Sequence, residues 1–131
     1  MRRAVLLVDE VWSVRFSKSN VKSTDRWPSA KRTVKRGEVL CGVNKGLPGF
    51  SIPDDKGDWT GFDVDFCRAV AAAIFDDPKK AKFVPLDANE RFKELQNRKV
   101  DILSRNTTWS MSRESNYALY FPAVAYYDGQ G

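Results

Sequence analysis

Three short apolar runs that alternate with two segments of helical periodicity constrain the fold of this chain most strongly. The runs at residues 39–43, 82–86 and 100–103 have the length and composition of buried strands. Between them, residues 63–75 and 87–96 carry apolar side chains at the spacing of a helix face. Strands that alternate with helices form mostly parallel sheets through right-handed crossovers. The sequence therefore predicts an α/β fold in which helices flank a mostly parallel sheet.

The ends of the two expected helices carry signals of their own. Asp76-Asp77-Pro78 ends the first helix, because proline cannot continue it. Asp87 followed by Glu90 resembles a capping box, which places the start of the second helix at Asp87. The apolar stripe of the first helix, which we assign to the core, consists of Phe66, Val70, Ala73 and Ile74.

The remaining segments after residue 37 connect or extend this framework. Residues 45–60 are rich in Gly, Pro and Asp, which predicts a loop, and residues 54–57 resemble a hairpin tip. Residues 111–117 predict a short helical turn, and residues 120–127 form an extended apolar segment. The predicted order is β-α-β-α-β-turn-β, which fills at most one domain in a chain of 131 residues.

The charge of the chain is concentrated in residues 1–36. That segment holds ten basic and three acidic residues, a net charge of +7, whereas residues 37–131 hold twelve basic and fourteen acidic residues, a net charge of −2. The core is therefore no polyanion binder by charge, and we expect no nucleic-acid partner. Residues 17–36 are polar and interrupted by Pro28, so we interpret residues 1–36 as a basic, loosely ordered leader. Alternation at Trp12, Val14 and Phe16 is compatible with one short strand.

The first ten residues resemble a weak secretory signal. Arg2 and Arg3 precede five apolar residues, but Asp9 and Glu10 then interrupt the run. A signal needs an apolar stretch of about 7–15 residues, so this one is weak or degenerate at best. No apolar run in the chain approaches the length of about 18 residues that a membrane-spanning helix needs.

Histidine and cysteine usage narrows the chemistry further. The chain has no histidine, which removes the usual general base and the commonest metal ligand. Cys41 and Cys67 are too far apart in sequence for a CxxC metal or redox motif. They are either two small buried apolar residues or a disulfide that ties the first strand to the first helix in an oxidising compartment. We expect no metal and no cofactor.

The two loops that follow residues 43 and 103 are the expected ligand site. In open α/β sheets, ligands bind beyond the carboxyl ends of the strands. The second loop contains Arg105-Asn106-Thr107-Thr108-Trp109-Ser110-Met111-Ser112-Arg113, which combines hydroxyl, amide and guanidinium groups before a short helix. Backbone N–H groups at a helix start favour an anion, and arginine matches a carboxylate with its planar fork. This stretch predicts recognition of a small carboxylate ligand.

Three segments, at residues 40–51, 61–70 and 100–113, resemble the periplasmic solute-binding proteins of polar amino-acid ABC transporters, family 3. They contain Leu-Cys-Gly-Val-Asn, Gly-Phe-Asp-Val-Asp-Phe-Cys and Ser-Arg-Asn-Thr-Thr-Trp, and the final Tyr-Tyr-Asp-Gly-Gln-Gly is similar too. The likeness is greatest to the general L-amino-acid-binding subgroup. It implies a two-lobed clamp of the type II periplasmic-binding-protein fold, of which residues 37–131 form part of the first lobe.

The resemblance also implies roles for particular residues. Arg113 resembles the arginine that grips the ligand α-carboxylate, and Thr108 resembles the residue that donates its backbone N–H and hydroxyl to the same group. Thr108 could simply be the cap of the following helix, which is compatible with a ligand contact. Asn106 lies where a main-chain carbonyl accepts from the α-ammonium, and Asn44 lies where relatives often place a polar contact.

Four further positions are expected near the ligand. Arg91 lies where acidic-amino-acid binders place an arginine that reads the ligand side chain; the alternative is a surface residue on its helix. Leu47, Phe50 and Trp109 are candidates for the cleft wall, although Phe50 and Trp109 could belong to the core instead.

These features predict binding of L-amino acids by a truncated, periplasmic solute-binding component that serves an ABC transporter permease. The second lobe is missing, so we expect weak binding and, because residues 120–127 lose their partner, a homodimer or strand-exchanged oligomer. The alternative is an assembly remnant that oligomerises without ligand. An enzyme on the same scaffold is disfavoured, since the site loops lack histidine and a close carboxylate pair.

Overall fold

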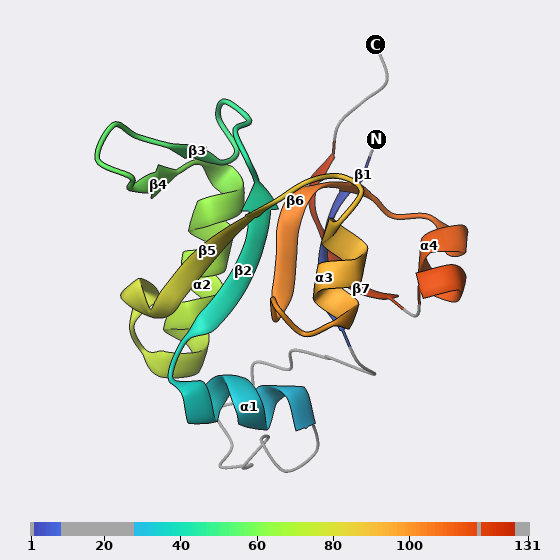
Figure 1. Cartoon of the computed structure of the whole chain (residues 1–131), viewed down its shortest axis with the longest axis horizontal. Helices are drawn as coiled ribbons and strands as arrows, with labels where there is room; N and C mark the ends of the chain where they lie inside the picture. The colour runs from blue at the N-terminus through green and yellow to red at the C-terminus, as the bar shows by residue number, and fades with distance from the viewer. Residues whose placement is uncertain (1, 9–27, 118, 128–131) are drawn as a thin grey trace.

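A computed structural model describes residues 2–8, 28–117 and 119–127 (Figure 1). Its main sheet has five strands in the order β5-β2-β6-β1-β7. Their bounds are β1 Arg2–Val8, β2 Val39–Asn44, β5 Ala81–Leu86, β6 Ile102–Thr108 and β7 Leu119–Tyr127. The helices are α1 Pro28–Arg36, α2 Phe62–Phe75, α3 Arg91–Gln96 and α4 Met111–Tyr117, with a 3-10 helix, η2, at Pro78–Lys80.

Three neighbouring strands confirm the expected parallel sheet. β2 lies between β5 and β6 and runs parallel to both, with Cys41 opposite Phe83 on one side and Ile102 on the other. Helices cover both faces of the sheet, with α2 on one face and α3 on the other (Figure 1). None of the helices in the described residues is long and apolar enough to cross a membrane.

Two parts of segment 1–36, residues 2–8 and 28–36, form regular elements that the sequence analysis did not expect. Residues 2–8 form β1, which lies inside the sheet and pairs antiparallel with β6 and with β7. The apolar run at residues 4–8, which resembled a weak secretory signal, is long enough to form a strand of the sheet. Residues 28–36 form α1, because proline is well suited to the first position of a helix. The possible strand at Trp12, Val14 and Phe16 lies outside the described residues.

The pairing of β1 also changes the expectation for the last strand. β7 is not left without a partner, because β1 of the same chain occupies one of its edges. Its other edge is the end of the sheet. The side chains of Val124, Tyr126 and Tyr127 are exposed on this strand.

The sheet divides the core into two apolar clusters. The cluster on the α2 face contains Val39, Cys41, Val43, Cys67, Ala71 and Ile102. The cluster on the α3 face contains Leu86, Phe92, Leu95, Val100, Leu103, Leu119 and Phe121. Ile102 and Leu103 are consecutive in β6 and fall in different clusters, because successive side chains of a strand point to opposite faces. This alternation fixes the face that each later residue of β6 occupies.

Two local boundaries differ from the sequence prediction. The Asp87–Glu90 capping box is wrong: α3 begins at Arg91, its N-cap residue Glu90 makes no side-chain cap bond, and the Asp87 carboxylate binds Lys45 at 2.5 Å. β6 continues to Thr108, well beyond the expected end at residue 103. Residues Arg105 to Thr108 therefore lie on a strand rather than in a loop.

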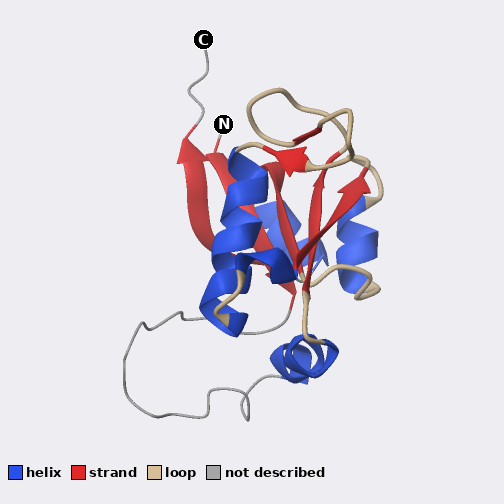
Figure 2. Ribbon diagram, turned by 90° about the vertical axis from the view of Figure 1, so that its left-hand side faces the viewer, coloured by secondary structure: helices blue, strands red, loops and turns tan. Residues whose placement is uncertain are grey.

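The loop before α2 is a hairpin attached to the helix start. β3 (Ile52–Pro53) and β4 (Trp59–Thr60) pair antiparallel, which confirms a hairpin tip at the intervening turn. Gly61 has a φ of 122° and its Cα lies so close to the Phe50 backbone that an added Cβ would collide with it. Figure 2 shows this hairpin and α1 at opposite ends of the sheet.

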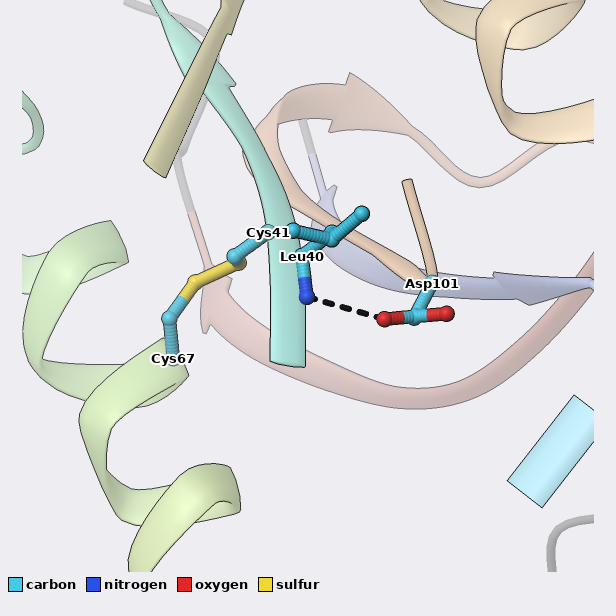
Figure 3. Close-up of a disulfide and its surroundings, with 4 residues drawn as sticks. All are labelled: Leu40, Cys41, Cys67 and Asp101. Carbon is cyan, nitrogen blue, oxygen red and sulfur yellow. Dashed lines mark hydrogen bonds between the residues drawn. A yellow bond between two sulfur atoms is a disulfide. The ribbon is translucent and has the colours of Figure 1, made fainter. Parts of the chain in front are cut away.

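A disulfide joins β2 to α2. It links Cys41 and Cys67, whose Cα atoms are 6.2 Å apart, and both residues are fully buried (Figure 3). Close to it, the Asp101 carboxylate accepts a hydrogen bond of 2.8 Å from the Leu40 backbone N–H. The same carboxylate binds the Arg36 guanidinium, which ties the end of α1 to the start of β2 and β6.

Candidate ligand-binding site

The carboxyl ends of β5, β2 and β6 lie along one edge of the sheet, as their parallel pairing requires. This edge is the one at which ligands bind in open α/β sheets. It is remote from α1, which lies at the amino end of β2 (Figure 1). Asn44 ends β2, Leu86 ends β5 and Thr108 ends β6. The structure thus brings together the two loops selected from the sequence.

Asn44 and Asn106 form a direct amide pair across this edge. Nδ2 of Asn44 donates to Oδ1 of Asn106 at 2.9 Å, and the Gly46 backbone N–H donates to Oδ1 of Asn44 at 3.2 Å. Both asparagines are half-buried. The pair connects the ends of β2 and β6 and leaves polar groups accessible from solvent.

Arg105 donates a hydrogen bond to this pair; it is the first residue of the stretch expected to bind a carboxylate, but the sequence analysis gave it no individual role. It is 4% exposed, its Nη1 donates to the Leu86 backbone carbonyl, and its Nη2 donates to Oδ1 of Asn106 at 3.2 Å. Burial lowers the pKa of the guanidinium, while the charges of Asp63 and Asp87 oppose this effect. The strand was expected to end at residue 103, which hid the signal: because β6 continues to Thr108, Arg105 follows Leu103 by two residues on the strand and shares its buried face.

The Arg113 guanidinium is held at the carboxyl edge of the sheet by a hydrogen bond to the end of β6. Its Nη1 donates to the Thr108 backbone carbonyl at 2.6 Å, and its guanidinium carbon lies 5.5 Å from the centre of the Phe92 ring. The guanidinium makes no other hydrogen bond with the described residues, so most of its donors remain available. Thr108 is not a helix cap, since it lies in β6 and α4 begins three residues later.

Arg91 is buried and lies against the same aromatic ring. Its guanidinium carbon lies 4.7 Å from the Phe92 ring centre, and the residue is only 8% exposed, so the surface alternative is wrong. Its Nε has no hydrogen-bond partner among the described residues. Burial, reinforced by the like charges of Arg105 and Arg113, lowers the pKa of Arg91 to about 10. The side chain is therefore a charged, incompletely satisfied donor at neutral pH.

The three expected wall residues belong to different groups. Phe50 packs edge-on against Phe62 and Tyr126, with ring centres 6.2 and 5.3 Å away. Trp109 stacks on Phe121 at 5.9 Å and is 38% exposed. Leu47 is half-buried and pairs with Ser51 in an isolated bridge. The structure does not bring Leu47, Phe50 and Trp109 together as one wall.

The resulting arrangement is a positively charged edge rich in hydrogen-bond donors. No carboxylate among the described residues forms a salt bridge with Arg91, Arg105 or Arg113. Within the same residues, no cluster of three or more His, Cys, Asp or Glu could hold a metal ion. Guanidinium forks beside amide donors are suited to binding a carboxylate.

Comparison with known proteins decides the family. Residues 39–131 match the bacterial extracellular solute-binding proteins, family 3. The chain belongs to this family. The matched range contains every residue of the positively charged edge, whereas β1 and α1 lie outside it.

Curated relatives share more than half of the matched residues. The chain is 56% identical over 96 residues to the general L-amino acid-binding periplasmic protein AapJ of Rhizobium johnstonii, which covers 73% of this chain and 28% of AapJ. It is 54% identical over 96 residues to the glutamate/glutamine/aspartate/asparagine-binding protein BztA of Rhodobacter capsulatus, with the same coverage. The chain thus spans about 28% of the length of these relatives.

Solved structures confirm the lobe architecture. A periplasmic binding protein from Brucella ovis with glutathione bound is 56% identical, with a TM-score of 0.67 over 68% of this chain and 28% of that chain. The arginine-bound form of domain 1 from TmArgBP is 25% identical, with a TM-score of 0.56 over 63% of this chain and 64% of that chain. The fold is therefore part of a type II periplasmic binding protein.

Proposed function

We propose that this chain binds L-amino acids by their α-carboxylate at the positively charged edge of its sheet. The observation that carries the proposal is the geometry of Arg113. One nitrogen of its guanidinium is fixed by the Thr108 carbonyl at 2.6 Å, and the rest of the fork makes no hydrogen bond with the described residues. A fork that is held in place and still has free donors suits a bidentate carboxylate contact.

The other site residues take supporting roles in this proposal. Thr108 offers its backbone N–H and hydroxyl to the same carboxylate, and the main-chain carbonyl of Asn106 accepts from the α-ammonium. Asn44 adds a polar contact from the neighbouring strand. Arg91 faces the ligand side chain. Relatives named as amino-acid-binding proteins support this assignment.

The affinity of this chain should be low. Arg113 is half-buried, and an ion pair that stays solvated contributes only about 0–1 kcal/mol, whereas a desolvated bidentate pair contributes more. A second lobe that closes over the ligand would supply the desolvation. The arginine-bound form of domain 1 from TmArgBP supports binding by a single lobe of this fold. We therefore expect dissociation constants in the millimolar range or somewhat below.

We further propose that the chain acts in the periplasm as part of a solute-binding component that delivers amino acids to an ABC transporter permease. The relatives are named as periplasmic and as transporter-binding proteins. The Cys41–Cys67 disulfide supports an oxidising compartment, because structural disulfides persist there and are rare in the cytosol.

Calorimetric titration with a panel of L-amino acids tests the proposed function. Wild-type protein should bind, and Arg113→Ala should lose binding of every amino acid, since the α-carboxylate is common to all of them. Arg32→Ala is the matched control, because Arg32 is an exposed arginine on α1 at the far end of the sheet. Absence of any response of the wild type at millimolar ligand would contradict the proposal.

A second candidate function is assembly without ligand. It is favoured by β7, which ends the sheet and exposes Val124, Tyr126 and Tyr127. A free edge with apolar side chains can pair with the same edge of a second copy and form a homodimer. Size-exclusion chromatography with light scattering tests this candidate, and a stable monomer at micromolar concentration would contradict it.

A further inference from the structure

The strand β1 enters the sheet from outside the part of the chain that matches the family. The match covers residues 39–131, whereas β1 consists of residues 2–8. In the sheet order β5-β2-β6-β1-β7, β1 separates two strands that both belong to the matched part. Residues 39–131 thus supply β6 and β7 but not the strand between them, and we call that position the β6/β7 slot.

The β6/β7 slot offers backbone groups on both of its sides. Within the described residues, β6 pairs with β2 only at Ile102 and Leu103, while Ser104 and Thr108 pair with β1. On the opposite side, β7 pairs with β1, and the outer side of β7 is the end of the sheet. A row of backbone N–H and C=O groups is a template for another strand, whatever the side chains of that strand. The slot is therefore built to bind an extended segment between two strands.

The pairing of β1 in this slot is irregular on both sides. Its register with β6 shifts between Arg3 and Val5. Its register with β7 shifts directly after Arg3 and again between Val5 and Leu7. Each shift interrupts the ladder of hydrogen bonds, as a β-bulge does. By contrast, β2 and β5 pair without a shift along the whole length of both strands. Of these strands, β1 is the one that local unfolding should release more easily.

The segment between β1 and α1 is long enough for β1 to reach a second copy of the chain. Residues 9–27 separate the two elements, and a segment of nineteen residues spans at most about 65 Å. A folded domain of this length has a radius of gyration of only about 14 Å. The far end of the segment is anchored, because Arg36 at the end of α1 binds the Asp101 carboxylate. A released β1 thus stays tethered to its own domain and can enter the slot of a neighbour.

We propose that the β6/β7 slot is an exchangeable strand-binding site and that its partner is residues 2–8 of a second copy of this chain. In the exchanged dimer, each copy lends its β1 to the other, so the sheet of the monomer is re-formed between chains. The lent strand then lies beside Ser104 and Thr108, in the part of β6 that carries the candidate ligand site. This contact differs from pairing of two β7 edges, which leaves each β1 in its own slot.

The tether sets the protein concentration at which exchange competes. A tether of this kind gives the chain's own β1 an effective concentration in the millimolar range. The monomer is therefore favoured when chains fold at micromolar concentration. Exchange competes when chains fold together at millimolar concentration.

Two cysteine variants test the exchange directly. Ala4 of β1 lies opposite Val124 of β7, so a disulfide between Ala4→Cys in one chain and Val124→Cys in another reports β1 of the first chain beside β7 of the second. The two variants are refolded together at millimolar concentration in a glutathione buffer, and peptide mass mapping separates the new disulfide from Cys41–Cys67. The matched control is Ala4→Cys with Val34→Cys, because Val34 is exposed on α1.

The expected result is a disulfide yield that depends on position and concentration. The Ala4–Val124 disulfide should exceed the control disulfide by at least about tenfold, because the register holds the two cysteines together at high effective concentration. Its yield should fall when the chains are refolded at micromolar concentration. Equal yields of the two disulfides would overturn the inference.

A measurement on the wild type keeps the inference testable if a cysteine variant misfolds. Chains refolded at millimolar concentration and then diluted to micromolar should contain a dimer by size-exclusion chromatography with light scattering. This dimer should persist after dilution, because return to the monomer requires β1 to leave both slots. A monomer under all conditions, or a dimer that dissociates at once on dilution, would overturn the inference. Neither experiment uses an amino acid, so its outcome is separate from that of the proposed binding function.

Discussion

Reduction of the Cys41–Cys67 disulfide should cost this chain a large part of its stability. The disulfide closes a loop with a sequence separation of 26 between β2 and α2. The chain-entropy relation for a loop of that length gives about 3.5 kcal/mol at 25 °C, because the cross-link restricts the unfolded chain. A domain of this size has a total unfolding free energy of only about 5–15 kcal/mol. The reduced protein should therefore remain folded with a much smaller margin.

Urea unfolding followed by tryptophan fluorescence measures the effect, with and without a phosphine reductant. For a typical slope of about 1–3 kcal/mol per molar urea, the midpoint should fall by roughly 1–3 M on reduction. The double variant Cys41→Ala/Cys67→Ala is the matched control, since its midpoint should not respond to the reductant. Coincident midpoints of the oxidised and reduced wild type would refute the loop-entropy reasoning, and two titratable thiols in the unfolded, unreduced chain would refute the disulfide itself.

Three further substitutions have defined outcomes. Gly42→Ala should destabilise the fold by about 1–3 kcal/mol in urea unfolding, because the added Cβ would collide with the buried Leu103 side chain. Asp101→Ala should lower the thermal midpoint through a loss of about 1–2 kcal/mol, since it removes the acceptor of the Leu40 N–H. Arg91→Met should stabilise the unliganded protein by about 1 kcal/mol at pH 7, because it removes a buried charge that lacks a carboxylate partner. The gain in stability of Arg91→Met over the wild type should shrink as the pH rises through about 10. Above that pH the Arg91 guanidinium loses its proton in the folded wild type but keeps it in the unfolded chain, so the cost of burying the charge falls.

Local sequence pattern was sufficient for the central part of the fold. The runs expected at 39–43 and 82–86 are β2 and β5, and the helix expected at 63–75 is α2 with one more residue at its start. In each of these elements, the spacing of the apolar residues and the residues that mark its ends lie within the element's own sequence. β1 could not be found in this way, because its place between β6 and β7 depends on pairing with residues about a hundred positions away.

In the site, too, local sequence pattern predicts some features, whereas others depend on contacts between distant residues. The motif around Arg113 was visible because its residue types follow one another in the chain. Arg105 belongs to that motif, but its hydrogen bonds reach the end of β5, 19 residues earlier, and Asn106, which also binds Asn44, 62 residues away. The capping box at Asp87 failed for the same reason, since a distant Lys45 binds that carboxylate. Sequence pattern located the edge, and tertiary contacts determined which atoms it presents.

The charge of this edge links folding to binding. Arg91 and Arg113 lie 4.7 and 5.5 Å from the same Phe92 ring, and their mutual repulsion is one cause of the lowered pKa of Arg91. The ring face attracts both cations but cannot neutralise them. A bound anion would neutralise the two guanidinium groups. The stabilisation that the anion gives to the fold grows with the ratio of the anion concentration to its dissociation constant. Arg91→Met should therefore be the more stable protein without ligand and show the smaller gain in thermal midpoint with glutamate, a reversal that a purely structural role of Arg91 does not produce.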